Sequence, residues 1–176
     1  MKTLLMTLII GLGFAQNSMA SILNLTGSPF LSTAGIQNLE LSYKVFEHWT
    51  FGLVGTSSSG HFKKSDIELS GNSYGGVIRY YIDTAFENDS WFVSGSATKS
   101  NYEASITSGG TQYTGKAEDW ATAGAGYHWF WKSFNFNFGA VISNQAKIQV
   151  KDALGNKYKD EFDPSFGLEI NIGGKF

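Results

Sequence analysis

Three histidines, His48, His61 and His128, are the residues of this chain best suited to act as general bases. Serine-based nucleophilic catalysis needs a histidine beside the hydroxyl and a carboxylate that orients the ring. Only His61 has both kinds of partner nearby in the sequence, because serines occupy positions 57–59 and Asp66 follows. Serines are common in loops, and no hydrolase or acyltransferase motif surrounds them. We therefore expect no catalytic residues, and a lipid-modifying enzyme remains the less favoured alternative.

Metal and thiol chemistry have few candidate ligands. The chain contains no cysteine, which excludes disulfides, thiolate metal sites and an anchor on a lipidated cysteine. His48 and His128 without a third ligand make a poor metal site. We expect no metal and no cofactor.

Several other charged residues, among them Glu40, Arg79 and Glu169, lie within segments that alternate between apolar and polar side chains. In residues 166–176, Phe166, Leu168, Ile170 and Ile172 share one face, because successive side chains of a strand point to opposite sides. The same alternation recurs earlier in the chain, at residues 21–28, 38–45, 49–54, 74–82, 91–98, 121–130 and 134–143. Gly27 and Pro29 interrupt the pattern at the end of the first of these segments. The sequence thus predicts eight β-strands.

Alternation alone does not say which face of a barrel meets water, since soluble barrels are apolar inside and membrane barrels are apolar outside. Short connections that alternate with long ones favour a membrane barrel, as do apolar stripes of roughly 9–11 residues. Aromatic residues beside the short turns would form one girdle at the membrane surface: Trp49, Tyr80, Trp91, Trp129, Trp131, Phe134 and Phe176. The predicted fold is an all-β, eight-stranded antiparallel up-and-down transmembrane β-barrel.

Residues 1–20 have the features of a cleaved signal peptide. Lys2 precedes an apolar run at 4–14, and Ser18-Met19-Ala20 forms a small-x-small cleavage site. The apolar run is shorter than the roughly 20 residues that a membrane-spanning helix needs, although a retained anchor is the alternative. We expect secretion to the periplasm and a single barrel domain at residues 21–176.

The chain ends on a hydrophobic residue, Phe176, at the close of an alternating strand. This ending resembles the closing strand of bacterial outer-membrane β-barrels, whose terminal phenylalanine is a signal to the outer-membrane assembly machinery. Residues 21–176 resemble the small eight-stranded outer-membrane proteins of the OmpA/OmpX and opacity-protein type. The resemblance implies the cell outer membrane of a Gram-negative bacterium and contact with lipid and lipopolysaccharide. It also implies a membrane-stabilising, adhesive or host-interacting role, although a few relatives modify lipids.

The polar face of such a barrel fills an interior that is just wide enough for side chains. Unpaired buried charges are very unfavourable, so the cations and carboxylates inside should pair. We expect a polar network formed by Glu40, Lys44, Arg79, Glu169 and Lys175. The favoured interpretation is a plugged interior, and the alternative is a narrow pore for small solutes or ions.

The long connections at 60–73, 101–119 and 144–163 contain β-forming residues around Gly109-Gly110 and around Leu154-Gly155-Asn156. They predict protruding hairpins, whose edges offer an extracellular partner a strand to pair with. Lysines in these connections are also placed to meet lipopolysaccharide phosphates.

The net charge of −2 is not that of a nucleic-acid binder. We expect a monomer.

Overall fold

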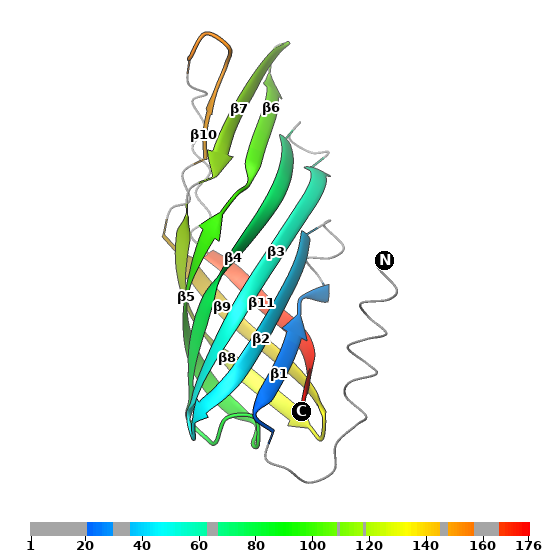
Figure 1. The fold of residues 1–176 in the computed structure, drawn as a ribbon, viewed down its shortest axis with the longest axis vertical. Coiled ribbons are helices and arrows are strands. Elements are labelled where there is room, and N and C mark those ends of the chain that lie inside the picture. The colour runs from blue at the N-terminus through cyan, green and yellow to red at the C-terminus, as the bar shows by residue number, and fades with distance from the viewer. Residues whose placement is uncertain are drawn as a thin grey trace.

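The computed structural model describes residues 21–29, 36–62, 67–108, 110–117, 119–144, 148–156 and 166–176. Most of them belong to strands (Figure 1). The strands are β1 (Leu23–Gly27), β2 (Ile36–Phe46), β3 (Trp49–Phe62), β4 (Ile67–Tyr81), β5 (Ser90–Ser100), β6 (Glu103–Ser108), β7 (Thr111–Ala117), β8 (Trp120–Trp131), β9 (Phe134–Ser143), β10 (Ile148–Lys151) and β11 (Phe166–Lys175).

Eight of these strands close into one antiparallel barrel. Around it the order is β1-β2-β3-β4-β5-β8-β9-β11, and β1 pairs with β11 to complete the ring. At the seam Asn24 lies opposite Lys175, and Leu23 and Phe176 exchange two backbone hydrogen bonds of 3.0 Å. The predicted all-β, eight-stranded antiparallel fold is confirmed.

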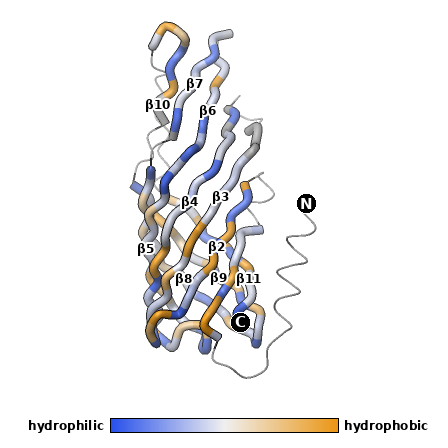
Figure 2. Tube along the Cα trace, viewed as in Figure 1, coloured by the Kyte–Doolittle hydropathy of each residue, from blue (hydrophilic) through white to orange (hydrophobic). Residues whose placement is uncertain are grey.

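The barrel is apolar outside and polar inside. Leu53 and Ile142 are about 60% exposed on the outer face, whereas Asn135 is fully buried. Figure 2 shows the hydrophobic positions concentrated on the lower part of the barrel strands and hydrophilic positions in the upper hairpin. An outer face of this kind is stable only against an apolar medium, as in transmembrane barrels.

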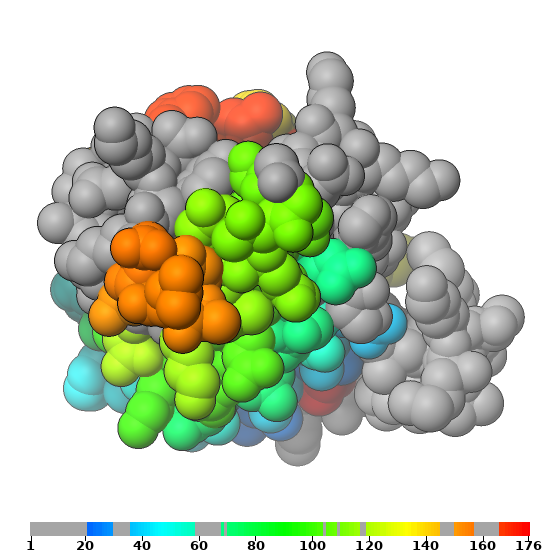
Figure 3. Space-filling view, turned by 90° about the horizontal axis from the view of Figure 1, so that it is seen from above, coloured from blue at the N-terminus to red at the C-terminus, as the bar shows by residue number. Residues whose placement is uncertain are grey.

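At the upper end the sheet continues beyond the barrel. β3 and β4 stay paired up to Phe62 and Ile67, so their strands continue into the long connection at 60–73. β6 pairs with the start of β4 and forms a hairpin with β7, next to Gly110, which has a φ of 80°. β10 pairs with β7. Seen from above, β6, β7 and the orange β10 segment project toward the viewer (Figure 3).

The lower end carries the short turns, and we call it the short-turn end. The expected signal peptide, residues 1–20, lies outside the described residues. Within the described part of the chain, no helix combines the length and apolar character needed to cross a membrane.

Candidate functional site

The centre of the barrel interior holds a cluster of three charged side chains from three strands. The Arg79 guanidinium on β4 donates through Nη1 and Nη2 to the Glu40 carboxylate on β2, with Nη2 to Oε2 at 2.9 Å. Its Nη2 also donates to Oε1 of Glu169 on β11 at 2.7 Å. The three side chains are only 7% to 14% exposed. A bidentate pair of this kind is among the strongest hydrogen-bond arrangements of ionised groups.

Arg79 and Glu169 come from opposite walls of the barrel. In the strand order around the barrel β4 is fourth and β11 is eighth, so four strand steps separate them in either direction. β2 lies midway along one of these paths. The cluster therefore crosses the interior from wall to wall.

Neutral side chains support this cluster. The Ser42 hydroxyl donates to Glu40, and the Asn171 amide donates to Oε1 of Glu169 at 2.9 Å. The Arg79 guanidinium lies 5.4 Å from the ring centroid of Phe92. These contacts give both carboxylates partners besides Arg79, which buried charges require. Nε of Arg79 is the one buried side-chain nitrogen or oxygen without a hydrogen-bond partner among the described residues.

Lys44 and Lys175 do not join this cluster, which corrects the expected five-residue network. Lys44 Nζ lies 2.5 Å from Glu87 Oε1, and Lys175 donates to the backbone carbonyl of Phe86. The reason is distance along the strands. Lys44 is four residues from Glu40 and Lys175 is six from Glu169, or about 13 Å and 20 Å at the rise of a strand.

A second layer, nearer the short-turn end, is a chain of neutral hydrogen-bonding groups. His128 on β8 lies between Tyr81 and Asn135, with 3.1 Å from Nδ1 to the Tyr81 oxygen and 2.9 Å from Nε2 to Asn135 Oδ1. Asn135 in turn donates to Asn24 Oδ1 at 2.7 Å. This pattern fits an imidazole that donates from Nε2 and accepts at Nδ1. All four side chains are buried, and the layer links β4, β8, β9 and β1.

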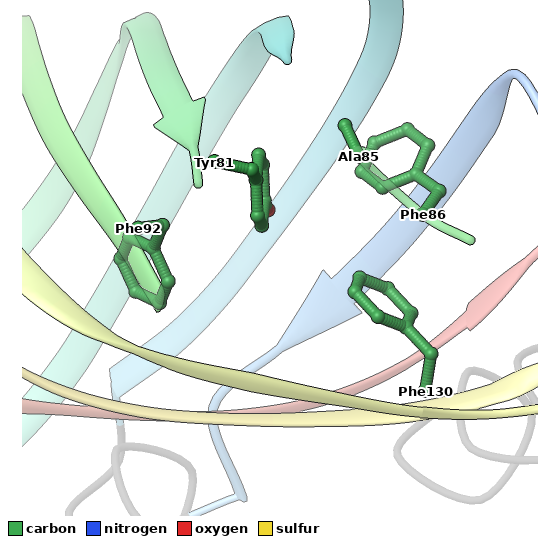
Figure 4. Packing of buried hydrophobic residues seen from close by; sticks show 5 residues of the cluster. All are labelled: Tyr81, Ala85, Phe86, Phe92 and Phe130. Atoms are coloured by element: carbon green, nitrogen blue, oxygen red, sulfur yellow. The ribbon is translucent and has the colours of Figure 1, made fainter. Parts of the chain in front are cut away.

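The β4–β5 turn, residues 82–89, folds back under this layer. Ala85 and Phe86 are fully buried and pack with Tyr81, Phe92 and Phe130, as Figure 4 shows. The Phe86 ring centroid lies 6.3 Å from that of Tyr81 and 6.1 Å from that of Phe130. Sequence reasoning treated this segment only as a short connection. The available signal was an apolar Phe86 within a polar turn, together with Phe92 and Phe130 on the otherwise polar faces of their strands.

At the upper end the interior is bounded by Tyr102 and Trp120, whose rings are stacked with centroids 6.1 Å apart. The Tyr102 hydroxyl lies 2.7 Å from the hydroxyl of Thr56, which also contacts Ser73 at 2.5 Å. Tyr102 is only 3% exposed. Aromatic and hydroxyl groups thus meet where the barrel joins the protruding sheet.

The residues of the expected aromatic girdle lie at the short-turn ends of their strands. Trp49 contacts Tyr80 with ring centroids 5.0 Å apart, and Trp131 contacts Phe134 at 5.7 Å. The indoles of Trp91 and Trp129 contact the ring of Tyr127 between them, at 5.2 and 4.7 Å. Phe176 is held by its backbone at the barrel seam. Its part in assembly stays a prediction.

The histidines lie at different places in the fold. His48 is in the β2–β3 turn with Nδ1 at 3.2 Å from the Asp83 carbonyl oxygen, whereas His128 is buried inside the barrel. His61 lies near the end of β3, but its side chain and Asp66 are outside the described part. In the described ranges no three histidine, aspartate or glutamate side chains gather as a metal site.

No protein-family model and no curated protein sequence matches this chain. Among solved structures it is similar to the crystal structure of the N-terminal β-barrel domain of Pseudomonas aeruginosa OprF. The TM-score is 0.54 at 14% sequence identity, covering 89% of this chain and 98% of the other. At this identity the similarity concerns the fold alone, a β-barrel.

Proposed function

We propose that this chain is a monomeric outer-membrane β-barrel protein with a closed interior, acting as a structural element of the membrane and presenting its upper hairpins outside the cell. The apolar outer face and the OprF-like fold support a Gram-negative outer membrane. We also propose that the protein is of the small OmpA/OmpX and opacity-protein type. In that orientation the short-turn end faces the periplasm.

The observation that carries the closed interior is the Arg79 cluster. An eight-stranded barrel leaves little room beyond its own side chains, and here an arginine and two glutamates reach across it. A hydrated ion would have to separate a bidentate pair inside a narrow space. A closed barrel is therefore favoured over a narrow pore.

The upper sheet is the part of the molecule suited to outside contacts. β6, β7 and β10 extend the sheet beyond the barrel, with exposed Lys116 and Lys151 on adjacent strands. Their ammonium groups are suitable partners for lipopolysaccharide phosphates. An extracellular protein partner and recognition of Phe176 by the assembly machinery are part of the same proposal.

The test is to fold residues 21–176 in detergent and record single-channel currents in planar bilayers, alongside a gel that compares heated and unheated samples. A heat-dependent shift in mobility with no conductance supports the closed barrel. Steady conductance would instead support the narrow pore and would overturn the proposed role.

A further inference from the structure

We infer that the β4–β5 turn, residues 82–89, is a displaceable plug that seals the periplasmic end of the barrel independently of the Arg79 cluster. The inference rests on the orientation in the proposed function. It adds a second closure, built from a folded-back turn rather than from side chains of the barrel wall.

The plug packs against aromatic side chains of the barrel interior, Tyr81, Phe92 and Phe130, which we call the aromatic seat. Phe86 is fully buried between Tyr81 and Phe130. This burial is notable because a turn at the open end of a barrel borders water, so its side chains can be solvent-exposed. Ala85 beside it is also fully buried. The interior of a transmembrane barrel is ordinarily polar, so an aromatic cluster inside one end requires an explanation other than the membrane. Closure of that end explains it.

Polar contacts hold the turn at its rim. Glu87 pairs with Lys44 of β2, and Lys175 of β11 donates to the carbonyl of Phe86. Asp89 accepts from the backbone N–H of Phe130 at 2.7 Å, and the Ala85 N–H donates to the carbonyl oxygen of Glu47 at 2.8 Å. The turn is thus attached to β2, β8 and β11, around much of the rim. The two lysines that are absent from the Arg79 cluster have their function here.

The same turn has features of a part that can open. Phe86 has a φ of 67°, which is unfavourable for a bulky residue and is kept only because the surroundings enforce it. The Glu87 side chain of the Lys44 pair is 44% exposed, so salt weakens that contact. Release would relax the backbone of Phe86 and uncover Tyr81 and His128. The Arg79 cluster would remain in place above them.

The absence of cysteine in the chain gives a clean test, because a single introduced thiol is the only one present. Thr50→Cys places it on β3 at the short-turn end, where Thr50 is only 2% exposed. The folded protein in detergent is treated with a negatively charged, water-soluble thiol reagent. Labelling is measured in Thr50→Cys alone, with Phe86→Gly, and with the milder Glu87→Gln. Phe134→Ala, which removes an aromatic ring from the outer face, is the control.

With the plug in place, the introduced thiol should react slowly, and Phe86→Gly should raise the labelling rate about tenfold or more because the contact with the aromatic seat is lost. Glu87→Gln should raise the rate less, more so at low salt, and Phe134→Ala should leave it unchanged. The heated and unheated gel shows that each variant is folded. Equal labelling of the thiol in Thr50→Cys alone and in both turn variants would overturn the plug. Conductance by the unsubstituted protein would overturn both the closed interior of the proposed function and the plug, whereas equal labelling without conductance would overturn the plug alone.

Discussion

Arg79 and Glu169 are 90 positions apart in the chain, yet Nη2 of one and Oε1 of the other lie 2.7 Å apart inside the barrel. They come from opposite walls, so their pairing requires that every strand between them is in place. Closure of β1 on β11 fixes the position of Glu169 relative to β4. The ion pair therefore reports on the register of the whole ring, and loss of register would leave charges unpaired in the interior.

Replacing Arg79 by methionine should lower the free energy of unfolding by about 3–5 kcal/mol, because two buried carboxylates lose their cation. The measurement is urea unfolding of the detergent-folded protein, followed by tryptophan fluorescence. Lys99→Met, at an exposed position on the neighbouring β5, should change stability little.

A triple variant separates charge from packing. Glu40→Gln and Glu169→Gln, combined with Arg79→Met, remove the uncompensated charges and should recover much of the lost stability. If the triple variant is as unstable as Arg79→Met, the loss arises from the missing side chain rather than from unpaired carboxylates.

Asn135→Ala should lower the free energy of unfolding by about 1–3 kcal/mol, since it leaves His128 Nε2 and Asn24 Oδ1 without their partner. A double-mutant cycle with His128→Ala measures their coupling. Coupling is expected because the two side chains belong to one buried layer. Additive effects of the two substitutions would show that the hydrogen bond carries no net stability.

The turn after β10 should depend on pH in the acidic range. The Asn156 side-chain N–H, aided by the backbone N–H groups of Leu154, Gly155 and Asn156, holds the pKa of the Asp152 carboxyl below its ordinary value of about 3.9. Ionised Asp152 thus stabilises the folded turn. This stabilisation is complete above about pH 4 and is lost as the pH falls through the lowered pKa of the folded state.

Carbon-detected NMR of the Asp152 carboxyl, with amide shifts of Leu154 and Asn156, measures this titration. Asp152→Asn should loosen the turn at pH 7 and abolish the acidic transition. A titration midpoint at or above that of a model peptide would contradict the assignment.

Much of this fold was predictable from the alternation of apolar and polar residues, because every second side chain of a strand points to the same side, whichever strand it pairs with. The inward faces of Glu40, Arg79 and Glu169 follow from it, and so does their expected pairing. The place of Lys44 and Lys175 does not. Alternation gives the face of a residue but not its height in the barrel, which depends on strand tilt and on the register of β1 against β11.

The packing of the β4–β5 turn into the barrel could not be predicted from the sequence, for a different reason. Residues 82–89 show no regular alternation of apolar and polar side chains. Phe86 is buried only because Tyr81, Phe92 and Phe130, which lie on three different strands, surround it in the folded barrel. The sequence predicted protruding hairpins at the long connections but not how far β3 and β4 stay paired, because serine and glycine positions such as 57–60 resemble a loop in composition. Their pairing is set by the partner strand rather than by their own propensity.

Gly173 at the seam between β1 and β11 and Gly95 on β5 make a matched pair of glycine substitutions. Gly173 faces inward opposite Thr26, and a Cβ built there would collide with the Leu25 carbonyl oxygen and come within 2.5 Å of Thr26 Cγ2. Backbone atoms cannot move aside cheaply, so Gly173→Ala should cost about 1–3 kcal/mol and lower folding yield. Gly95→Ala on β5 is the control, since its nearest neighbours lie at 3.9 Å. Refolding yield from the heated and unheated gel, with urea midpoints, compares the two.

Because the seam sets the height of Glu169, the stability lost in Gly173→Ala should also be smaller in a Glu169→Gln background. Equal losses in both backgrounds would mean that the seam and the Arg79 cluster act independently.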